Sequence, residues 1–563
     1  MKRALLCAVA FLFCVAAAVP AQQAQQPATG TAGMISSAHP LATEAGLEIL
    51  REGGNAFDAA VAVAATLNVV EPMMSGMGGY GTILIYDAKK KEARFLNCSG
   101  RIPQALDSDV FRAPTPNWRE NRTGAKAVST PGNLNCWDAM SRQYGKLEWK
   151  RLFDAATRAA ADGFVIDEGT AQMIARAFPD FPDHAKASYG KQGRALQAGE
   201  RLVQKDLAAS FRLIARDGAA ALHGGELGKA IDREMRARQS FLSLADLQQN
   251  RAEWWEPIQI PYRGHVVMTA SPPANSFDML VRLGMMSRLD TRAMGHNSAD
   301  YLHWFAEVTK HGFYVRLRYA SDPDVASPPL QKLFSEAYWT AENAKIDPQK
   351  AAPFTPPGVT GDPDSHTTHF VVADGEGNVV SATQTLGNLF GSRIMAPGTG
   401  IWLNNSLAYS TFEPKGNPMD AFPGRHKLSG DCPTLIFRDG KLWAALGTPG
   451  GHTIGQTVPQ IVMNLIHFEM DIQQAIAAPR VSFAEPDRLL VERTVADEVR
   501  AALSARGHNV QPVGGLGNAH GLTIEYDAAG KPVRFSGAAD PRGAGTAKGH
   551  SPAISPSRQS EKN

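Results

Sequence analysis

Apolar residues follow two different spacings along the chain, and the change falls near residue 367. Between Trp149 and about Arg318 they recur mostly with a helical period, as in WKRLFDAATRAAADGF. After Thr367 they alternate with polar residues over short stretches such as THFVVAD, NVVSATQTL and KLWAALG, which is typical of strands. A further strand is expected at 82–86. Strands at both ends around a helical middle predict an α+β layered sandwich built from both halves of the chain.

Two helices are predicted near the N-terminus. The first follows the apolar spacing of HPLATEAGLEILREGGN and ends at Gly53-Gly54, because glycine commonly terminates helices. Asn55 then caps a second helix, with Asp58 at its third position. That second helix, in AFDAAVAVAATLNVVEP, is apolar on all sides, so we expect it to be buried.

Three glycines after the second helix match the spacing GxGxxG, namely Gly76, Gly78 and Gly81. A dinucleotide site needs a strand before the glycines and a helix after them. Here a helix precedes them and the strand at 82–86 follows. Close backbone packing is therefore favoured over a nucleotide site.

The first 21 residues have the organisation of a secretory signal peptide. Lys2 and Arg3 precede the apolar stretch 5–19, and small residues lead up to Ala21. We predict cleavage after Ala21 and a periplasmic or secreted protein with no membrane association after signal removal. The alternative is an uncleaved membrane anchor, for which the apolar stretch is short.

Both ends of the mature chain are rich in small and polar residues. Residues 22–32 are expected to form a flexible leader, with order beginning near Met34. The tail from about residue 545 is expected to be disordered. The formal net charge of +2 gives no indication of a nucleic-acid partner.

Cysteine and histidine usage indicates neither a disulfide framework nor a metal centre. Cys7 and Cys14 belong to the predicted signal peptide, which leaves Cys98, Cys136 and Cys432. Three thiols without a CxxC pair argue against a disulfide framework and a zinc site, and the 15 histidines include no HExxH motif. We expect no required metal or other cofactor.

A pair of threonines faces a second pair across a predicted hairpin. The segment 346–366 is rich in Pro, Gly and Asp and marks a boundary directly before Thr367. The turn DGEGN centres a hairpin that places Thr367 opposite Thr385. A two-residue change in register would place Thr383 there instead, on the same face.

A threonine hydroxyl is a weak nucleophile until a base accepts its proton. When threonine is the first residue of a chain, its own α-amine can be that base, with a reference pKa of about 7.7–8.0. Thr367 is internal, so a cut before it would create this amine, and the Pro/Gly/Asp segment upstream suits such a cut. The alternative is that these threonines are ordinary strand residues.

A glycine-containing turn follows one of the later strands. The strand ends near Leu446, and Gly447-Thr448-Pro449-Gly450-Gly451 leads into a helix. Adjacent glycines leave backbone N–H groups uncovered, and the helix N-terminus adds positive potential. This turn could bind an oxyanion, the alternative being an ordinary strand–helix connection.

Several blocks, in order along nearly the whole mature chain, resemble the γ-glutamyltransferase (glutathione hydrolase) family. They include SSAHPLATEAGLEILREGGNAFDAAVA, STPGNLNCWDAMSRQYGKLEWKRLFDAATRAAADGF, NSADYLHWFAEVTKHGFYVRLRYASDP, TTHFVVADGEGNVVSATQTL, LNNSLAYS, GTPGG and GAADPR. The resemblance implies an N-terminal-nucleophile hydrolase fold, a four-layer αββα sandwich. It also implies a proenzyme that cuts itself between His366 and Thr367. The large chain of residues 22–366 and the small chain of residues 367–563 would remain together.

The resemblance also implies roles for individual residues. Thr367 would be the nucleophile of both self-cleavage and acyl transfer, and Thr385 would position and activate it. Gly450 and Gly451 match the oxyanion hole. The reaction implied is transfer of a γ-glutamyl group from an amide to Thr367, and then to water or to the amine of an amino acid or peptide.

The positions that hold the donor's α-carboxylate depart from the family pattern. The family's arginine falls at about Ser99, and Arg101 lies two residues further on. Arg101 could replace it through bidentate pairing or could be structural. The family's serine pair corresponds to Ser429 and Gly430.

The positions that hold the donor's α-amino group depart as well. The family's Asn, Gln and Asp fall at Gly387, Ser406 and Tyr409, with Asn388 one residue away. Losing the carboxylate at position 409 would remove a charge-assisted bond of about 1.5–3 kcal/mol. Acylase relatives, whose substrates lack that amine, lack this acid too.

Three functions are therefore compared. The first is an autoprocessing γ-glutamyltransferase or glutathione hydrolase. The second is a glutaryl- or cephalosporin-type acylase with the same mechanism, favoured by Tyr409 and Ser406. The third is a catalytically silent member that kept the fold, which would persist as a single uncut chain.

Overall fold

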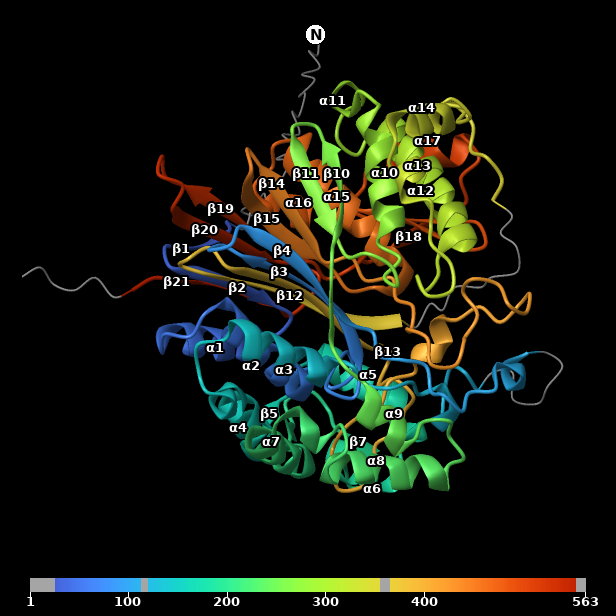
Figure 1. Cartoon of the computed structure of the whole chain (residues 1–563). Coiled ribbons are helices and arrows are strands. Elements are labelled where there is room, and N and C mark those ends of the chain that lie inside the picture. The colour runs from blue at the N-terminus through green and yellow to red at the C-terminus, as the bar shows by residue number, and fades with distance from the viewer. Residues whose placement is uncertain (1–25, 113–119, 355–364, 553–563) are drawn as a thin grey trace, which may run out of the picture.

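The computed structural model describes residues 26–112, 120–354 and 365–552 of the chain. Two antiparallel seven-stranded sheets form its centre (Figure 1). The β15 sheet contains, in spatial order, β1 (Ala28–Gly30), β20 (Pro532–Ala539), β19 (His520–Tyr526), β15 (Lys441–Gly447), β14 (Thr434–Arg438), β11 (His265–Thr269) and β10 (Ile258–Tyr262). The β12 sheet contains β21 (Thr546–His550), β2 (Gly33–Ser37), β12 (Ser365–Asp374), β13 (Val379–Asn388), β3 (Tyr80–Asp87), β4 (Glu92–Cys98) and β9 (Glu253–Trp255).

Side-chain alternation along β12 separates two hydrophobic cores. Val371 and Ala373 belong to a cluster shared with β15-sheet residues such as Leu435. Phe370 and Val372 lie on the opposite face, in a cluster with the helices of the N-terminal half. Since Thr367 and Val371 share a parity, Thr367 lies on the face of β12 that is turned toward the other sheet.

Helices pack on the outer faces of the sheets. Those of the N-terminal part, drawn blue to green in Figure 1, include α1 (Pro40–Arg51), α2 (Ala56–Val70), α3 (Asn133–Tyr144), α4 (Asp154–Asp162), α5 (Glu168–Ala177), α6 (Asp183–Tyr189), α7 (Lys205–Asp217), α8 (Glu226–Ala237) and α9 (Leu244–Gln249). Those on the side of the β15 sheet include α10 (Phe277–Ser287), α11 (Thr291–Met294), α12 (Ala299–Tyr319), α13 (Leu330–Leu333), α14 (Glu336–Asn343), α15 (Ile454–Ile466), α16 (Ile472–Ala477) and α17 (Asp497–Ala505). A small third sheet of β16 (Val481–Ala484), β17 (Arg488–Glu492) and β18 (Val510–Val513) lies on this side. The predicted α+β class and the helical middle of the chain are confirmed.

The start of α2 agrees closely with its prediction. The side chain of Asn55 accepts hydrogen bonds from the N–H groups of Phe57 and Asp58, and the Asp58 carboxylate accepts from the N–H of Asn55. This is a capping box, which satisfies N–H groups that have no partner inside the helix. All residues of α2 are buried, because α2 lies between the β12 sheet and the outer helices.

Both expectations of disorder at the chain ends were wrong for the described residues. Residues 28–30 form β1, paired with β20, although the leader was expected to be flexible up to residue 32. Residues 546–550 form β21, paired with β2, although the tail was expected to be disordered from about 545. Strand pairing supplies backbone partners that composition alone does not reveal. The predicted signal peptide lies outside the described residues.

The expectation for the cysteines was also wrong. Cys98 and Cys136 form a disulfide with their Cα atoms 5.8 Å apart, whereas the sequence argued against a disulfide framework. The end of β4 meets the start of α3 here, and the contact is so close that a Cβ on Gly132 would lie 2.2 Å from the carbonyl oxygen of Cys98. Cys432 is buried and free. Proximity through the fold, not spacing in the sequence, creates the pair.

A search of the described helices for a membrane-spanning segment finds none of sufficient length and hydrophobicity.

Candidate active site

The predicted threonine pair is present at the start of the β12–β13 hairpin. Thr367 lies opposite Thr385, and the hydroxyl of Thr367 donates a hydrogen bond to that of Thr385 at 3.2 Å. The register shifts between His366 and Thr367, a local irregularity at the head of the strand. Thr383 lies opposite His369 and contacts its Nδ1 at 2.8 Å. The register with Thr385 is therefore confirmed over the one with Thr383.

Thr385 connects the candidate nucleophile to the peptide bond before it. Its hydroxyl donates to the carbonyl oxygen of His366 at 2.6 Å and accepts from the N–H of Gly387 at 2.7 Å. The chain is continuous through β12, so this carbonyl belongs to the bond that would be cut. Thr367 and Thr385 are only 4% and 2% exposed, so bulk water competes little for these bonds.

The glycine turn after β15 approaches the same strand. Gly450 has φ 129° and Gly451 has φ 56°, values that favour glycine, and the short helical turn Gly451–Thr453 follows before α15. This turn contacts β12. Among the described residues nothing accepts a hydrogen bond from the N–H of Gly450 or Gly451. The turn beside β12 therefore offers two N–H groups of the kind that an oxyanion hole uses.

The glycines at 76–81 fill a packing role. A Cβ on Gly78 would lie 2.1 Å from the carbonyl oxygen of Trp402, and one on Gly79 would lie 2.2 Å from that of Thr385. β3 follows them directly, as predicted. The expectation of close backbone packing is confirmed, and it brings β3 against the hairpin that carries the threonines.

Arg101 is engaged in an ion pair. Its guanidinium donates to Glu253 at 2.7 Å and to the carbonyl oxygen of Gly424 at 3.0 Å. Glu253 also contacts Nε2 of His426 at 3.1 Å, and Nδ1 of His426 contacts Asp322 at 3.1 Å. Burial disfavours the imidazolium, but the hydrogen bonds and charges of the two carboxylates together outweigh it and raise the pKa of His426 to about 9.

The other residues expected to hold the donor's α-carboxylate have contacts within the protein. The hydroxyl of Ser99 donates to Asn97 Oδ1 at 2.6 Å. Ser429 bridges to Ala274, and its side chain is hydrogen-bonded to Asp431. Gly430 lies against the phenol of Tyr409, where a Cβ would come within 2.7 Å of the hydroxyl oxygen. An alanine at 430 would therefore require the phenol of Tyr409 to shift.

The positions expected to hold an amino group are occupied by neutral side chains. The hydroxyl of Ser406 contacts that of Ser129, and its N–H donates to Asn404. The N–H of Asn388 donates to Asn405 Oδ1 at 2.9 Å. Burial raises the pKa of Tyr409, so its phenol is uncharged at neutral pH. At 387, φ is 103°, and a Cβ there would lie 2.1 Å from Asn405 Oδ1, which explains the glycine.

Sequence reasoning missed a buried polar group next to the threonines. Tyr80 of β3 lies opposite Thr385 and shares a hydrogen bond with its side chain. Lys427 lies over the ring of Tyr80, with Nζ 3.1 Å from the ring centroid. Asp431 accepts a hydrogen bond from Thr82 at 3.1 Å. Extending the strand pairing to β3 could have found Tyr80, but Lys427 and Asp431 are in a loop whose path no periodicity predicts.

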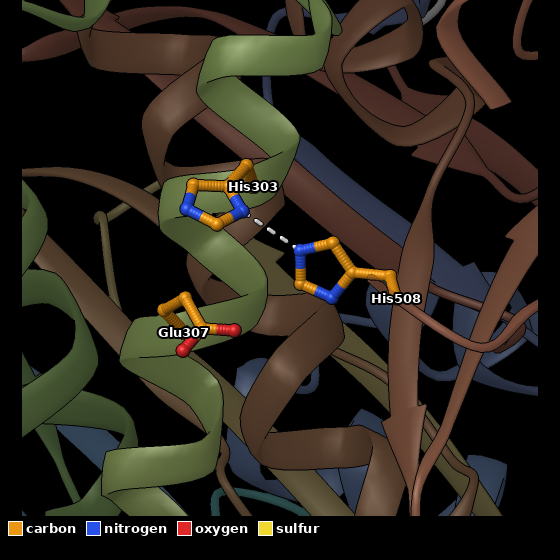
Figure 2. A group of neighbouring side chains, drawn as sticks. All are labelled: His303, Glu307 and His508. Carbon is orange, nitrogen blue, oxygen red and sulfur yellow. Dashed lines mark hydrogen bonds between the residues drawn. The ribbon is translucent and has the colours of Figure 1, made fainter. Parts of the chain in front are cut away.

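A second cluster has the composition of a metal site. His303 and Glu307 lie one turn apart on α12, and Nδ1 of His303 contacts Nε2 of His508 at 2.8 Å (Figure 2). However, Lys310 Nζ lies 2.7 Å from Glu307 Oε1, which already places a positive charge on this carboxylate. Burial lowers the pKa of His508 to about 3, so the two imidazoles pair as neutral groups. The cluster is satisfied internally and supports no metal assignment.

Comparisons with known proteins point to one family. The family model for gamma-glutamyltranspeptidase matches residues 42–550. The acylase ACY 1 proenzyme of Pseudomonas sp. (strain V22) is 36% identical over 498 residues, which cover 86% of this chain and 88% of that protein. The glutathione hydrolase proenzyme of Escherichia coli (strain K12) is 31% identical over 535 residues, covering 92% and 91%.

Solved structures of acylases and gamma-glutamyltranspeptidases also match this chain. A cephalosporin acylase from Bacillus halodurans superposes with a TM-score of 0.86 at 27% identity, covering 95% of this chain and 98% of the other. A Helicobacter pylori gamma-glutamyltranspeptidase gives a TM-score of 0.54 at 30% identity, covering 56% and 92%. The fold is thus that of the N-terminal-nucleophile enzymes. Within that class, this chain belongs to the gamma-glutamyltranspeptidase family.

Proposed function

We propose that this protein is an autoprocessing threonine amidohydrolase and acyltransferase that cleaves γ-glutamyl amides. The observation that carries the proposal is the position of the Thr385 hydroxyl, which accepts from Thr367 and donates to the carbonyl of His366. One side chain thereby holds the nucleophile and polarises the bond to be attacked. A silent scaffold would have no need of this arrangement.

Self-cleavage would proceed as an acyl shift followed by hydrolysis. Oγ1 of Thr367 attacks the carbonyl carbon of His366, and the hydrogen bond from Thr385 stabilises the developing oxyanion. The C–N bond breaks, the amine of Thr367 takes up a proton, and His366 is left as an ester on Oγ1. Water hydrolyses this ester and leaves two chains, 22–366 and 367–563. Thr367 then has both a free hydroxyl and a free α-amine.

Amide turnover would use these two groups together. The α-amine of Thr367 accepts the proton as Oγ1 attacks the donor's carbonyl, and it later passes a proton to the leaving amine. The N–H groups of Gly450 and Gly451 would stabilise the tetrahedral oxyanion. Water or the amine of an amino acid or peptide then takes the acyl group from Oγ1. No cofactor enters any of these steps.

A glutaryl- or cephalosporin-type acylase is the second candidate. It is supported by Tyr409, a neutral residue where the family has an acid, and by the acylase ACY 1 proenzyme at 36% identity. The two candidates share all of the chemistry above. They differ in whether the donor must carry an α-amine.

We also propose the four-layer αββα arrangement and export to the periplasm or beyond. The layered arrangement is supported by a hydrophobic cluster between the two sheets and by helices that contact their outer faces. Export is supported by the signal-like residues 1–21 and by the disulfide between Cys98 and Cys136, since disulfides persist in oxidising compartments.

The test is intact-mass analysis of the purified protein and of Thr367→Ala, followed by a donor panel. The wild type is expected to give two chains with Thr367 at a new N-terminus and to release glutamate from a γ-glutamyl anilide. Thr367→Ala should remain one chain without activity, and Thr367→Ser, which keeps a hydroxyl, should still be cut. A single wild-type chain, or amide turnover by Thr367→Ala, would contradict the proposal.

A further inference from the structure

Lys427 is a buried lysine whose ammonium group lies against aromatic rings. Its side chain is almost completely enclosed, at 2% exposure for the residue. Among the described residues, Nζ has no hydrogen-bond acceptor and no carboxylate within 4.0 Å. Its nearest aromatic neighbours are the rings of Tyr80 and Tyr409, whose centroids lie 3.1 Å and 5.4 Å from Nζ.

Lys310, the other lysine buried among the described residues, has the partners that Lys427 lacks there. Lys310 Nζ donates to Glu307 at 2.7 Å and to the carbonyl oxygen of Ala352 at 2.6 Å. Arg101, the cation expected to bind a carboxylate, is likewise paired with Glu253. An ammonium group without such partners costs several kcal/mol to bury. Burying the ammonium group of Lys427 is therefore energetically unfavourable, whereas the partners of Lys310 offset this cost.

Lys427 lies close to the reacting threonines. Tyr80, whose ring it covers, shares a hydrogen bond with Thr385, which in turn contacts Thr367. The N–H of Lys427 donates to the carbonyl of Gly100 at 3.2 Å, which fixes the backbone that carries this side chain. Only two side chains thus separate the unpaired ammonium from the nucleophile.

The surroundings favour an anion at this point. The faces of Tyr80 and Tyr409 attract the ammonium and hold it without neutralising it. Asp431 is the carboxylate that acts on Lys427 through its charge, but it lies beyond ion-pair distance and is hydrogen-bonded to Thr82 and Ser429. Burial lowers the pKa of Lys427, and an incoming carboxylate would offset this by favouring the charged form.

We infer that Lys427 recognises a carboxylate carried by the acyl group of the donor, so that the preferred substrates are amides of dicarboxylic acyl chains. This inference rests on the proposed function. The carbonyl carbons of a five-carbon diacid are about 5 Å apart when the chain is extended. Such a chain would lie along Tyr80, with its amide carbonyl at Thr367 and its free carboxylate at Lys427. Both γ-glutamyl and glutaryl donors satisfy this requirement.

The test compares Lys427→Met with the wild type on three anilides of equal chain length. The γ-glutamyl donor carries a carboxylate and an amine, the glutaryl donor carries only the carboxylate, and the pentanoyl donor carries neither. Lys427→Met keeps the length of the side chain and removes its charge. We expect kcat/KM to fall about tenfold to a hundredfold on both acidic donors, mainly through KM, because a charge-assisted bond is lost. Turnover of the pentanoyl donor should be unchanged or improved.

Two further variants make the outcome decisive. Lys427→Arg, which keeps a cation, should retain the preference for acidic donors, and Lys150→Met, an exposed lysine, should match the wild type. Equal losses on all three donors, or no loss on the acidic ones, would overturn the inference while leaving the amidase function in place. So would variants at 427 that all remain uncut, since Lys427 would then serve processing. A processed wild type inactive on all three donors would contradict the proposed function and this inference with it.

Discussion

At the scale of single residues, two of the hydrogen bonds of the Thr385 hydroxyl bear directly on self-cleavage. The hydroxyl accepts from Thr367 at 3.2 Å and donates to the carbonyl of His366 at 2.6 Å. Neither contact depends on Thr383, which is hydrogen-bonded to His369. The two threonines of β13 therefore allow a matched comparison.

Thr385→Val is expected to slow self-cleavage by about 10²–10³, the usual effect of removing one oxyanion donor. Valine has nearly the same shape as threonine, so the hairpin should be preserved. Cleavage is followed by denaturing gel electrophoresis from the time of synthesis, with Thr385→Ser and Thr383→Val as controls that should be cut. Rapid cutting of Thr385→Val would refute the assignment.

Residues on the hairpin were predictable from the sequence, and those in loops were not. Strand alternation and the DGEGN turn were enough to place Thr367 opposite Thr385, because both depend on local geometry. Lys427 and Asp431 reach the site through the loop between residues 424 and 433, which follows no repeat. Arg101 was within the predicted region, but its ion pair with Glu253 spans 152 residues of sequence.

At the scale of elements, the start of β3 is held by contacts that only glycine permits. Gly78 lies against the backbone of Trp402, and Gly79 lies against the backbone of Thr385. A backbone cannot move aside as a flexible side chain can. The packing of β3 on the hairpin therefore depends on these glycines and not on any bound nucleotide.

Gly78→Ala is expected to lower the thermal-unfolding midpoint markedly and to reduce self-cleavage, because its Cβ would lie 2.1 Å from the oxygen of Trp402. Gly169→Ala is the matched control, since its Cβ would meet nothing closer than 3.7 Å and it lies within helix α5. That variant should be neutral or slightly stabilising. Differential scanning fluorimetry compares the two. A midpoint for Gly78→Ala equal to that of Gly169→Ala would show that the close contact is unimportant.

Elements with strong local signals were predicted, whereas those that depend on distant pairing were not. Helix α2 and its cap could be read from Asn55, Asp58 and the apolar run that follows. Strands β1 and β21 were missed, because ATG and TAKGH have no strand pattern and are ordered only by their partners β20 and β2. The disulfide of Cys98 and Cys136 was missed for the same reason.

At the scale of the whole molecule, segments from both sides of the proposed cut are interleaved. β12 and β13 lie between β2 and β3, so the small chain would occupy the centre of a sheet whose flanks come largely from the large chain. The hydrogen bonds between β2 and β12 and between β13 and β3 would then join the two chains. Separating them would require opening the core, which is why we expect them to stay together after cleavage.

A polar network also crosses the proposed cut. His426 of the small-chain region lies between Asp322 and Glu253 of the large-chain region, at 3.1 Å from each. The hydrogen bond from His426 lowers the pKa of Glu253 to about 2, so both carboxylates remain charged near neutral pH. The cationic imidazole is the central charge of this network, with its side chain 5% exposed.

Stability should therefore fall at alkaline pH in a manner that His426 controls. Its pKa is raised from 6.5 to about 9 in the folded protein, so its stabilisation is fully present below pH 6.5 and is lost as the pH rises through 9. A shift of this size corresponds to about 3 kcal/mol. The thermal midpoint of His426→Gln should thus lie several degrees below that of the wild type at pH 7, and the difference should shrink by pH 10. Groups that titrate in both proteins cancel in this difference. A gap that stays constant from pH 7 to pH 10 would mean that packing, and not the charge on the imidazole, holds the two regions together at this point.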